Sequence, residues 1–111
     1  MPAADFLLEH MGRTLWDPVD TTQLGSLDRR LHARVNGEIY RFSRPATMAR
    51  FRRDPVRWCG ILRDPVNGAR FIPNRLSPRY PYWDSPYFFA SESTYAAFKA
   101  DPERYAIHRD Y

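Results

Sequence analysis

The stretch "FRRDPVRW" at residues 51–58 recurs as "FKADPERY" at residues 98–105, 47 positions later. The same offset aligns "WDPV" (16–19) with "RDPV" (63–66), and "EIYRFS" (38–43) with "SPYFFA" (85–90). Three blocks that match in one register without a gap indicate an internal duplication. The fold is therefore expected to repeat as well.

Each copy contains the pattern of a β-hairpin that follows a turn. Asp-Pro-Val predicts the turn, because proline fixes its own φ and biases the preceding residue away from a helix. In the first copy "LHARV" and "EIYRFS" flank Asn36-Gly37, a strong signal for a tight hairpin. In the second copy "RYPYW" and "PYFFAS" flank Asp84. We expect one hairpin in each copy.

A short helix is expected after each hairpin, over "PATMARFRR" and "SESTYAAFKA". Ser43 and Ser91 are predicted to be the residues that cap the first turn of these helices. The Asp-Pro pairs at 54–55 and 101–102 should end each helix and open a further short turn. Trp58 and Tyr105 then fold back onto the hairpins.

The predicted fold class is α+β, with two tandem ββα units packed as one small domain. Residues 1–16 form an N-terminal helical segment ("DFLLEHMG", capped by Asp5 and ended by Gly12), residues 17–60 the first repeat and residues 64–107 the second. A repeat of 44 residues has little core of its own, so the copies are expected to share one. The aromatic residues expected to be most buried are Phe42, Phe51, Trp58, Phe89, Phe98 and Tyr105.

Composition excludes several classes of protein. The chain has 111 residues, 43% hydrophobic and 15% aromatic, which is enough for a small globular core. A single cysteine, Cys59, excludes an internal disulfide and a cysteine-cluster metal site. The N-terminus lacks the pattern of a signal peptide, and no stretch approaches the roughly 20 apolar residues of a membrane span. These features predict a soluble, cytoplasmic protein without a membrane span.

The order of motifs resembles the YHS domain, a family of small TRASH-like metal-binding modules. The resemblance rests on Asp-Pro-Val, a hairpin ending in Tyr-x-Phe, and a helix ending in Phe-x-x-Asp-Pro-x-x-Tyr, and it covers both repeats. The stretch "YFFASESTYAAFKADPERY" in the second copy is the most similar. The resemblance implies tandem YHS-like folds.

The metal-binding cysteines that the resemblance implies are absent. In the family they follow Asp-Pro-Val and lie at the junction of hairpin and helix. Every thiolate is missing from both copies: alanine cannot bind a metal, and neutral hydroxyls are poor ligands for a soft or borderline metal ion. We therefore expect no bound metal and no cofactor. The six positions hold Asp20, Ser43 and Thr47 in the first copy and Asn67, Ala90 and Thr94 in the second.

No catalytic set is found in the sequence. His10, His32 and His108 are scattered and lack metal-site spacing, and the lone Cys59 is interpreted as a packing residue. Neither a Ser-His-acid order nor a glycine-rich phosphate loop is present. The chain is predicted not to be an enzyme.

Two surfaces are candidates for binding a partner. Residues 17–60 contain nine Arg and five acidic residues, whereas residues 64–107 contain five basic and five acidic residues, so the net charge of +4 belongs to the first copy. The second copy is instead rich in aromatic residues, which are favoured in binding interfaces. For both groups the alternative is an ordinary solvated or covered face. The residues are Arg44, Arg50, Arg53 and Arg57 (with Arg41 and Arg52 nearby), and Tyr80, Tyr82 and Trp83.

The functional hypothesis is a non-catalytic, YHS-like accessory module that binds a protein partner, as part of a larger complex or as a homo-oligomer. One alternative, by analogy with the family, is a protein that handles metals or accompanies a metalloenzyme. A second alternative is nucleic-acid binding through the arginines of the first repeat.

Overall fold

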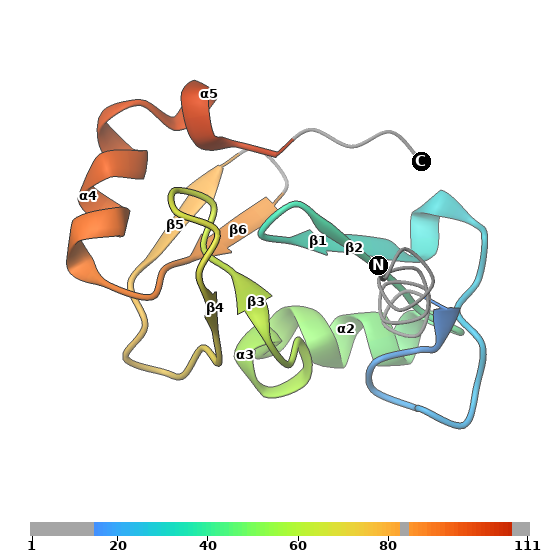
Figure 1. The fold of residues 1–111 in the computed structure, drawn as a ribbon. Helices are drawn as coiled ribbons and strands as arrows, with labels where there is room; N and C mark the ends of the chain where they lie inside the picture. The colour runs from blue at the N-terminus through green and yellow to red at the C-terminus, as the bar shows by residue number, and fades with distance from the viewer. Residues whose placement is uncertain (1–14, 83–84, 108–111) are drawn as a thin grey trace, which may run out of the picture. The chain divides into compact units, whose positions relative to one another are not determined.

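The computed structural model describes residues 15–82 and 85–107. The expected N-terminal helix with Asp5, His10 and Gly12 lies outside the described residues, as do Trp83, Asp84 and His108. Within the described residues the chain is α+β, as predicted (Figure 1). Three two-stranded sheets, β1–β2, β3–β4 and β5–β6, are present in this part of the chain.

The two copies have the same elements in the same register. The first contains β1 (His32–Val35), β2 (Glu38–Arg41), α2 (Pro45–Arg53) and α3 (Pro55–Trp58). The second contains β5 (Arg79–Tyr82), β6 (Ser85–Phe88), α4 (Glu92–Ala100) and α5 (Pro102–Tyr105). Every bound in the second copy lies 47 residues after its counterpart. The duplication in sequence is therefore a duplication of secondary structure.

The copies differ around the Asp-Pro-Val turn. In the second copy the turn joins β3 (Leu62–Arg63) to β4 (Arg70–Phe71), which pair antiparallel. In the first copy the same place has only an isolated bridge between Trp16 and Leu24, followed by a short 3-10 helix, η1 (Arg29–Leu31). This region is where the duplicated scaffold has diverged most.

The turn of the first hairpin has the geometry that its sequence predicts. Asn36 and Gly37 both have positive φ, 51° and 77°, as a type I′ turn requires. Gly37 is also required by packing, because a Cβ atom there would lie 2.6 Å from the Cβ of Ile107. The backbone thus needs glycine for two separate reasons.

The caps of the main helices correct one prediction. Ser91 is the N-cap of α4, and its hydroxyl accepts a hydrogen bond from the Thr94 N–H at 3.2 Å. The N-cap of α2 is Arg44 rather than Ser43, and it makes no side-chain capping bond. The prediction for Ser43 was wrong because its hydroxyl is a donor to Asp17 instead.

The Asp-Pro pairs end both main helices in one conformation. Asp54 and Asp101 share φ −151° and ψ 72°, and the Asp101 N–H donates back to the last turn of α4. Asp101 precedes Pro102 at the start of α5, but its side chain makes no capping bond. The proline therefore sets the new turn through its fixed φ.

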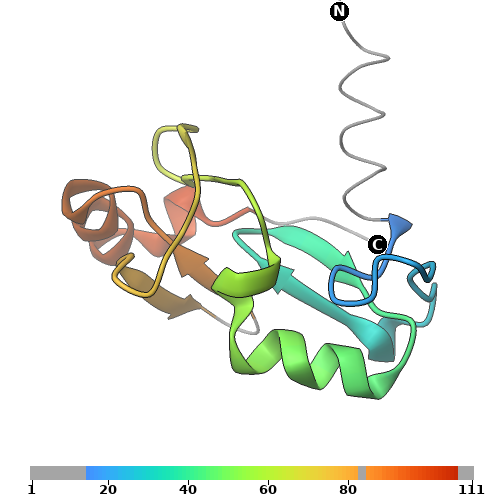
Figure 2. The ribbon, with the colours of Figure 1, turned by 90° about the horizontal axis from the view of Figure 1, so that it is seen from below.

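The described residues divide into two units that do not follow the repeat boundaries. One unit contains residues 15–33 and 39–54, and the other contains residues 34–38, 55–82 and 85–107. In the first unit α2 lies along β2 (Figures 1 and 2). Phe51 of α2 is 1% exposed and packs its ring 5.0 Å from Tyr40 and 5.1 Å from Phe42. This aromatic cluster is the core of the unit.

Phe98 is the centre of the aromatic core in the second unit. Its side chain is fully buried, and four rings surround it with centroids at 4.8 to 6.0 Å. These rings come from β5, β6 and the residue after β6: Tyr80, Tyr82, Tyr87 and Phe89. Such ring pairs stabilise a small core beyond the area that they bury.

Four of the six aromatics expected in the core are buried, and two are not. Trp58 and Tyr105 are only half-buried, so their placement among the most buried residues was wrong. Each lies on a four-residue helix with no buried residue. A guanidinium covers each ring, Arg57 at 4.8 Å and Arg104 at 5.3 Å. Both copies thus have a cation–π contact on the aromatic residue that ends the short helix.

The longest described helices, α2 and α4, have nine residues each. None of the helices in residues 15–82 and 85–107 has the length and apolar character needed to cross a bilayer.

Replacing Phe98 with alanine should destabilise the protein strongly. The substitution removes a fully buried ring with four aromatic neighbours, which typically costs about 3–5 kcal/mol. Chemical denaturation followed by circular dichroism measures the loss in free energy of unfolding. Ala96→Ser, on an exposed position of the same helix, is the control and should stay within about 0.5 kcal/mol of wild type. A loss for Phe98→Ala as small as that of the control would contradict this description of the core.

Candidate functional site

Each copy buries the carboxylate of its Asp-Pro-Val turn. Asp17 is fully buried and Asp64 is 1% exposed. A buried charge is costly unless hydrogen bonds replace the water that it loses. The groups that donate hydrogen bonds to these two carboxylates therefore show how the turn is connected to the following helix.

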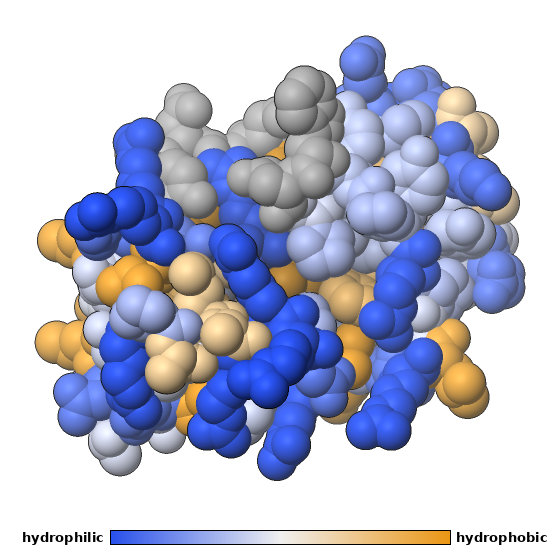
Figure 3. Space-filling model, turned by 180° about the vertical axis from the view of Figure 1, so that it is seen from behind, coloured by the Kyte–Doolittle hydropathy of each residue, from blue (hydrophilic) through white to orange (hydrophobic). Residues whose placement is uncertain are grey.

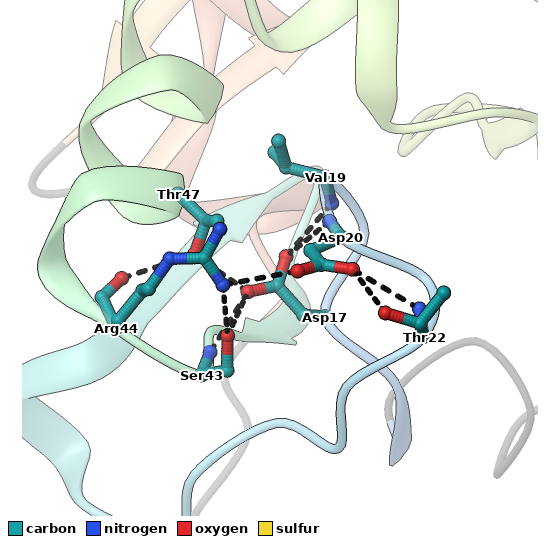
Figure 4. Close-up of polar contacts among 7 residues, drawn as sticks. All are labelled: Asp17, Val19, Asp20, Thr22, Ser43, Arg44 and Thr47. Carbon is teal, nitrogen blue, oxygen red and sulfur yellow. Dashed lines mark hydrogen bonds and ion pairs between the residues drawn. The ribbon is translucent and has the colours of Figure 1, made fainter.

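Five donors surround the carboxylate of Asp17 (Figure 4). Oδ2 accepts hydrogen bonds from the Thr47 hydroxyl at 2.5 Å and from both the N–H and the hydroxyl of Ser43 at 2.8 Å. Oδ1 accepts from the backbone N–H of Val19 at 2.8 Å and of Asp20 at 3.0 Å. Both oxygens of Asp17 are saturated by protein donors.

Asp64 repeats the arrangement with fewer donors. Its Oδ2 accepts from the Thr94 hydroxyl at 2.6 Å and from the Ala90 N–H at 3.0 Å, and Oδ1 accepts from the Val66 N–H at 2.9 Å. Each donor lies 47 residues after its counterpart around Asp17. Two donors to Asp17 have no counterpart here: the hydroxyl of Ser43, because the second copy has alanine at that position, and the backbone N–H of Asp20. We call each buried aspartate with its donors a carboxylate hub.

The hub joins the turn to the start of the following helix. Thr47 and Thr94 are the third residues of α2 and α4, where backbone N–H groups carry a partial positive charge. A carboxylate is stabilised there both by the threonine hydroxyl and by the helix dipole. Each hub therefore fixes the turn, the end of the hairpin and the helix to one another.

Burial and hydrogen bonding act in opposite directions on Asp17. Burial raises the pKa of the carboxyl, whereas the bonds from the Ser43 N–H, the Thr47 hydroxyl and the Asp20 and Val19 N–H groups lower it. The hydrogen bonds prevail, and the pKa of Asp17 lies below its ordinary value. The hub of the first copy is thus built around an ionised carboxylate.

Asp20 and Arg44 form an outer layer of the first hub. Asp20 Oδ1 accepts from the Thr22 hydroxyl at 2.6 Å, and Oδ2 pairs with Nη1 of Arg44 at 3.0 Å. Thr22 and then Arg44 lower the pKa of Asp20. Arg44 also donates to the Ser43 hydroxyl at 3.3 Å. The charge of Arg44, one of the predicted partner-binding residues, is therefore matched by an acid of its own repeat.

The hub occupies the place where the resemblance implies metal ligands. Ser43 and Thr47 converge on Asp17, and Asp20 lies beside them (Figure 4). These hydroxyls and this saturated carboxylate do not fit a soft metal ion, since every Asp17 oxygen already accepts at least two protein donors. Among the described residues, no group of three or more His, Cys, Asp and Glu could hold an ion. At these positions the side chains of Ser43 and Thr47 donate hydrogen bonds to Asp17.

Sequence reasoning missed Asp17 and Asp64 as the centres of the hubs. The sequence pattern Asp-Pro-Val predicts only a turn. The positions at which the resemblance implies cysteines were considered only as possible metal ligands. A signal was present, because an aspartate and a threonine recur 30 residues apart in both copies. A polar pair kept at one spacing in two diverged copies indicates a shared contact.

Of the predicted partner-binding residues, Arg44, Arg50 and Arg53 belong to the first unit, and Arg57, Tyr80 and Tyr82 belong to the second. Arg50 and Arg53 are exposed on α2, and Arg57 is exposed over the ring of Trp58. Tyr80 and Tyr82 are half-buried against Phe98, so packing already uses part of their surface. The face seen in Figure 3 has projecting hydrophilic side chains with hydrophobic residues scattered among them.

The remaining candidates are placed as follows. His32 is 7% exposed, and its Nε2 lies 2.8 Å from the Ser26 carbonyl oxygen. Cys59 is 3% exposed, with its Sγ 3.8 Å from the Gly60 carbonyl oxygen.

No protein-family model, curated protein or solved structure matches this chain.

The stability of the protein should fall in acid partly through Asp17. Because its folded-state pKa is lowered, the unfolded chain binds a proton first as the pH falls, and stability is lost between the unfolded pKa of about 4 and the lower folded value. Above that window the contribution is fully present. Urea unfolding from pH 7 to pH 2 should show this loss, and Asp17→Asn should remove part of the slope. An unchanged slope in Asp17→Asn would contradict the ionised hub.

Proposed function

We propose that the chain is a non-catalytic, cytoplasmic interaction subunit, a YHS-like module that has replaced metal ligands with carboxylate hubs and recognises an acidic protein surface through α2. The comparison of α2 with α4 carries this proposal. The two helices have the same length and the same buried positions, Thr47 and Phe51 in one and Thr94 and Phe98 in the other. Their exposed faces can therefore differ without cost to the scaffold.

The exposed faces differ mainly in charge. Arg50, Arg52 and Arg53 of α2 correspond to Ala97, Lys99 and Ala100 of α4. The alanines in α4 show that packing in this helix does not need arginine at two of the three positions. Arginine binds carboxylates in bidentate geometry and is enriched in protein interfaces. The charge on α2 thus supports a role in recognition.

The same arginines would also attract nucleic acid, and this is the second candidate function. The attraction would be mainly electrostatic and would weaken steeply as salt is raised. The metal-handling alternative is less well supported, because the hub oxygens are already used by protein donors.

Changing Arg50 and Arg53 to serine should abolish partner binding with little loss of stability. Exposed substitutions usually change the free energy of unfolding by within about 0.5 kcal/mol, so the variant should fold like wild type. The experiment is affinity purification of the full chain from its native host, with quantitative comparison of the proteins recovered by wild type and variant. Lys99→Ser, at the position of Arg52 in the other copy, is the matched control and should recover the same proteins as wild type.

Recovery of the same proteins by the Arg50→Ser/Arg53→Ser variant would contradict the proposal. Anisotropy with a labelled RNA and a labelled DNA duplex tests the second candidate. Tight, salt-sensitive binding that the arginine variant loses would favour nucleic acid over an acidic protein.

A further inference from the structure

The tripeptide Val-Asn-Gly occurs twice in the chain, at residues 35–37 and 66–68. Asparagine followed by glycine is the pair in which a side-chain amide is lost most readily in water, because glycine has no side chain to hinder attack by its own backbone nitrogen. The residue before each pair is the same, so the intrinsic reactivities of the two asparagines are closely similar. A difference between them in the folded protein must come from the structure.

Asn36 is buried, and hydrogen bonds fix its side chain. It is 2% exposed. Its Nδ2 donates to the carbonyl oxygens of Arg63 at 2.9 Å and Phe88 at 3.0 Å, and its Oδ1 accepts from the Phe88 N–H at 2.7 Å. The following glycine is crowded as well, since a Cβ atom on Gly37 would lie 2.6 Å from the Cβ of Ile107. The amide can neither rotate nor meet water here unless the fold opens.

Asn67, in contrast, is exposed in the turn between β3 and β4. Gly68 is exposed too, and no atom of the described residues other than its chain neighbours lies within 4 Å of the place that a Cβ on this glycine would take. Asn67 Oδ1 accepts a hydrogen bond from the Ala69 N–H at 3.0 Å. This bond keeps the side chain folded along the two residues that follow, and it polarises the carbonyl group that would be attacked. The site therefore has both open space and a polarised amide.

One hydrogen bond opposes a reaction at this site. The Gly68 N–H donates to the Asp64 carbonyl oxygen at 2.8 Å, and it must leave this oxygen before its nitrogen can lose the proton. The residues that would move, 67–69, are all exposed, so their movement uncovers no buried side chain of their own. Exposed segments open at low free energy, whereas a buried contact opens only with the core around it. The opening that Asn67 needs is therefore far more frequent than the opening that Asn36 needs.

We propose that Asn67 is a site of spontaneous modification, at which water converts the asparagine to aspartate and isoaspartate. The Gly68 nitrogen loses its proton and attacks Cγ of Asn67, and the side-chain amide group leaves as ammonia together with a proton. The product is a cyclic imide. Water then adds to one of the two carbonyl carbons of the ring and breaks the bond from that carbon to nitrogen. Opening at Cγ gives aspartate, and opening at the backbone carbon gives isoaspartate, in which the chain continues through the former side chain.

The modification changes the second copy in two ways. It adds a negative charge to a repeat with five basic and five acidic residues, at the position where the first copy already has Asp20. The aspartate product thus fits a place in the scaffold that accepts an acid. Isoaspartate instead lengthens the backbone of a turn that the Asp64 N–H closes by donating to the Ala69 carbonyl oxygen at 2.8 Å. We expect the isoaspartate form to weaken the pairing of β3 with β4.

The test follows both asparagines in one sample of the full chain. The folded protein is kept in mildly alkaline buffer, portions are digested with trypsin over time, and mass spectrometry measures the exchange of an amide for a carboxyl group. Trypsin releases the two sites in separate peptides, VNGEIYR (35–41) and DPVNGAR (64–70). Modification at residue 67 should be at least about tenfold faster than at residue 36, whose side chain is held by buried hydrogen bonds. In concentrated urea the two rates should become similar.

Asn67→Gln is the matched control, because ring closure through the longer side chain is much slower. This variant should lose the acidic form that isoelectric focusing detects in wild type, and Asn67→Asp marks the position of that form. Equal rates at residues 36 and 67 in the folded chain would overturn the proposal, as would an Asn67 that stays unmodified. An acidic form that accumulates in Asn67→Gln as fast as in wild type would assign the modification to another residue and also overturn it.

Discussion

The hydrogen bond from a threonine in the first turn of a helix to a buried aspartate is the contact on which each repeat depends. Asp17 and Thr47, and likewise Asp64 and Thr94, are 30 residues apart in sequence and join at 2.5 and 2.6 Å. The bond ties the Asp-Pro-Val turn to the helix that closes the repeat. Hairpin and helix can then pack their aromatic side chains against each other, as Phe98 does against Tyr87.

This arrangement gives each small repeat a cross-link made of hydrogen bonds between segments that are distant in sequence. A small fold needs a cross-link between distant segments, and metals or disulfides often supply it. Here a buried carboxylate with hydrogen bonds to protein donors has that role. Its contribution to the stability of the fold depends on every donor being present. The hub holds each scaffold together from within, so that the exposed face of α2 could diverge from that of α4 without loss of the scaffold.

Much of the fold could be predicted from sequence because the same pattern of hairpin and helix occurs in both copies. The hairpin at Asn36-Gly37 followed from the demand for positive φ, and the helix ends followed from Asp-Pro. Long-range polar contacts were not predictable in this way. The role of Ser43 was misassigned because a serine before a helix can cap it or donate elsewhere, and only the position of Asp17 decides between them. Trp58 was expected in the core as the aromatic residue that folds back onto the hairpin, but its ring is only half-buried and lies beneath the guanidinium of Arg57.

A double-mutant cycle in each copy tests the carboxylate hub most directly. The free energies of unfolding of Asp17→Asn, Thr47→Val and their combination give one coupling energy, and Asp64→Asn with Thr94→Val gives the other. Residues that share a buried network couple by about 0.5–3 kcal/mol, and we expect a value in this range for both pairs. A coupling energy indistinguishable from zero in either copy would contradict the claim that the aspartate–threonine contact holds each repeat together.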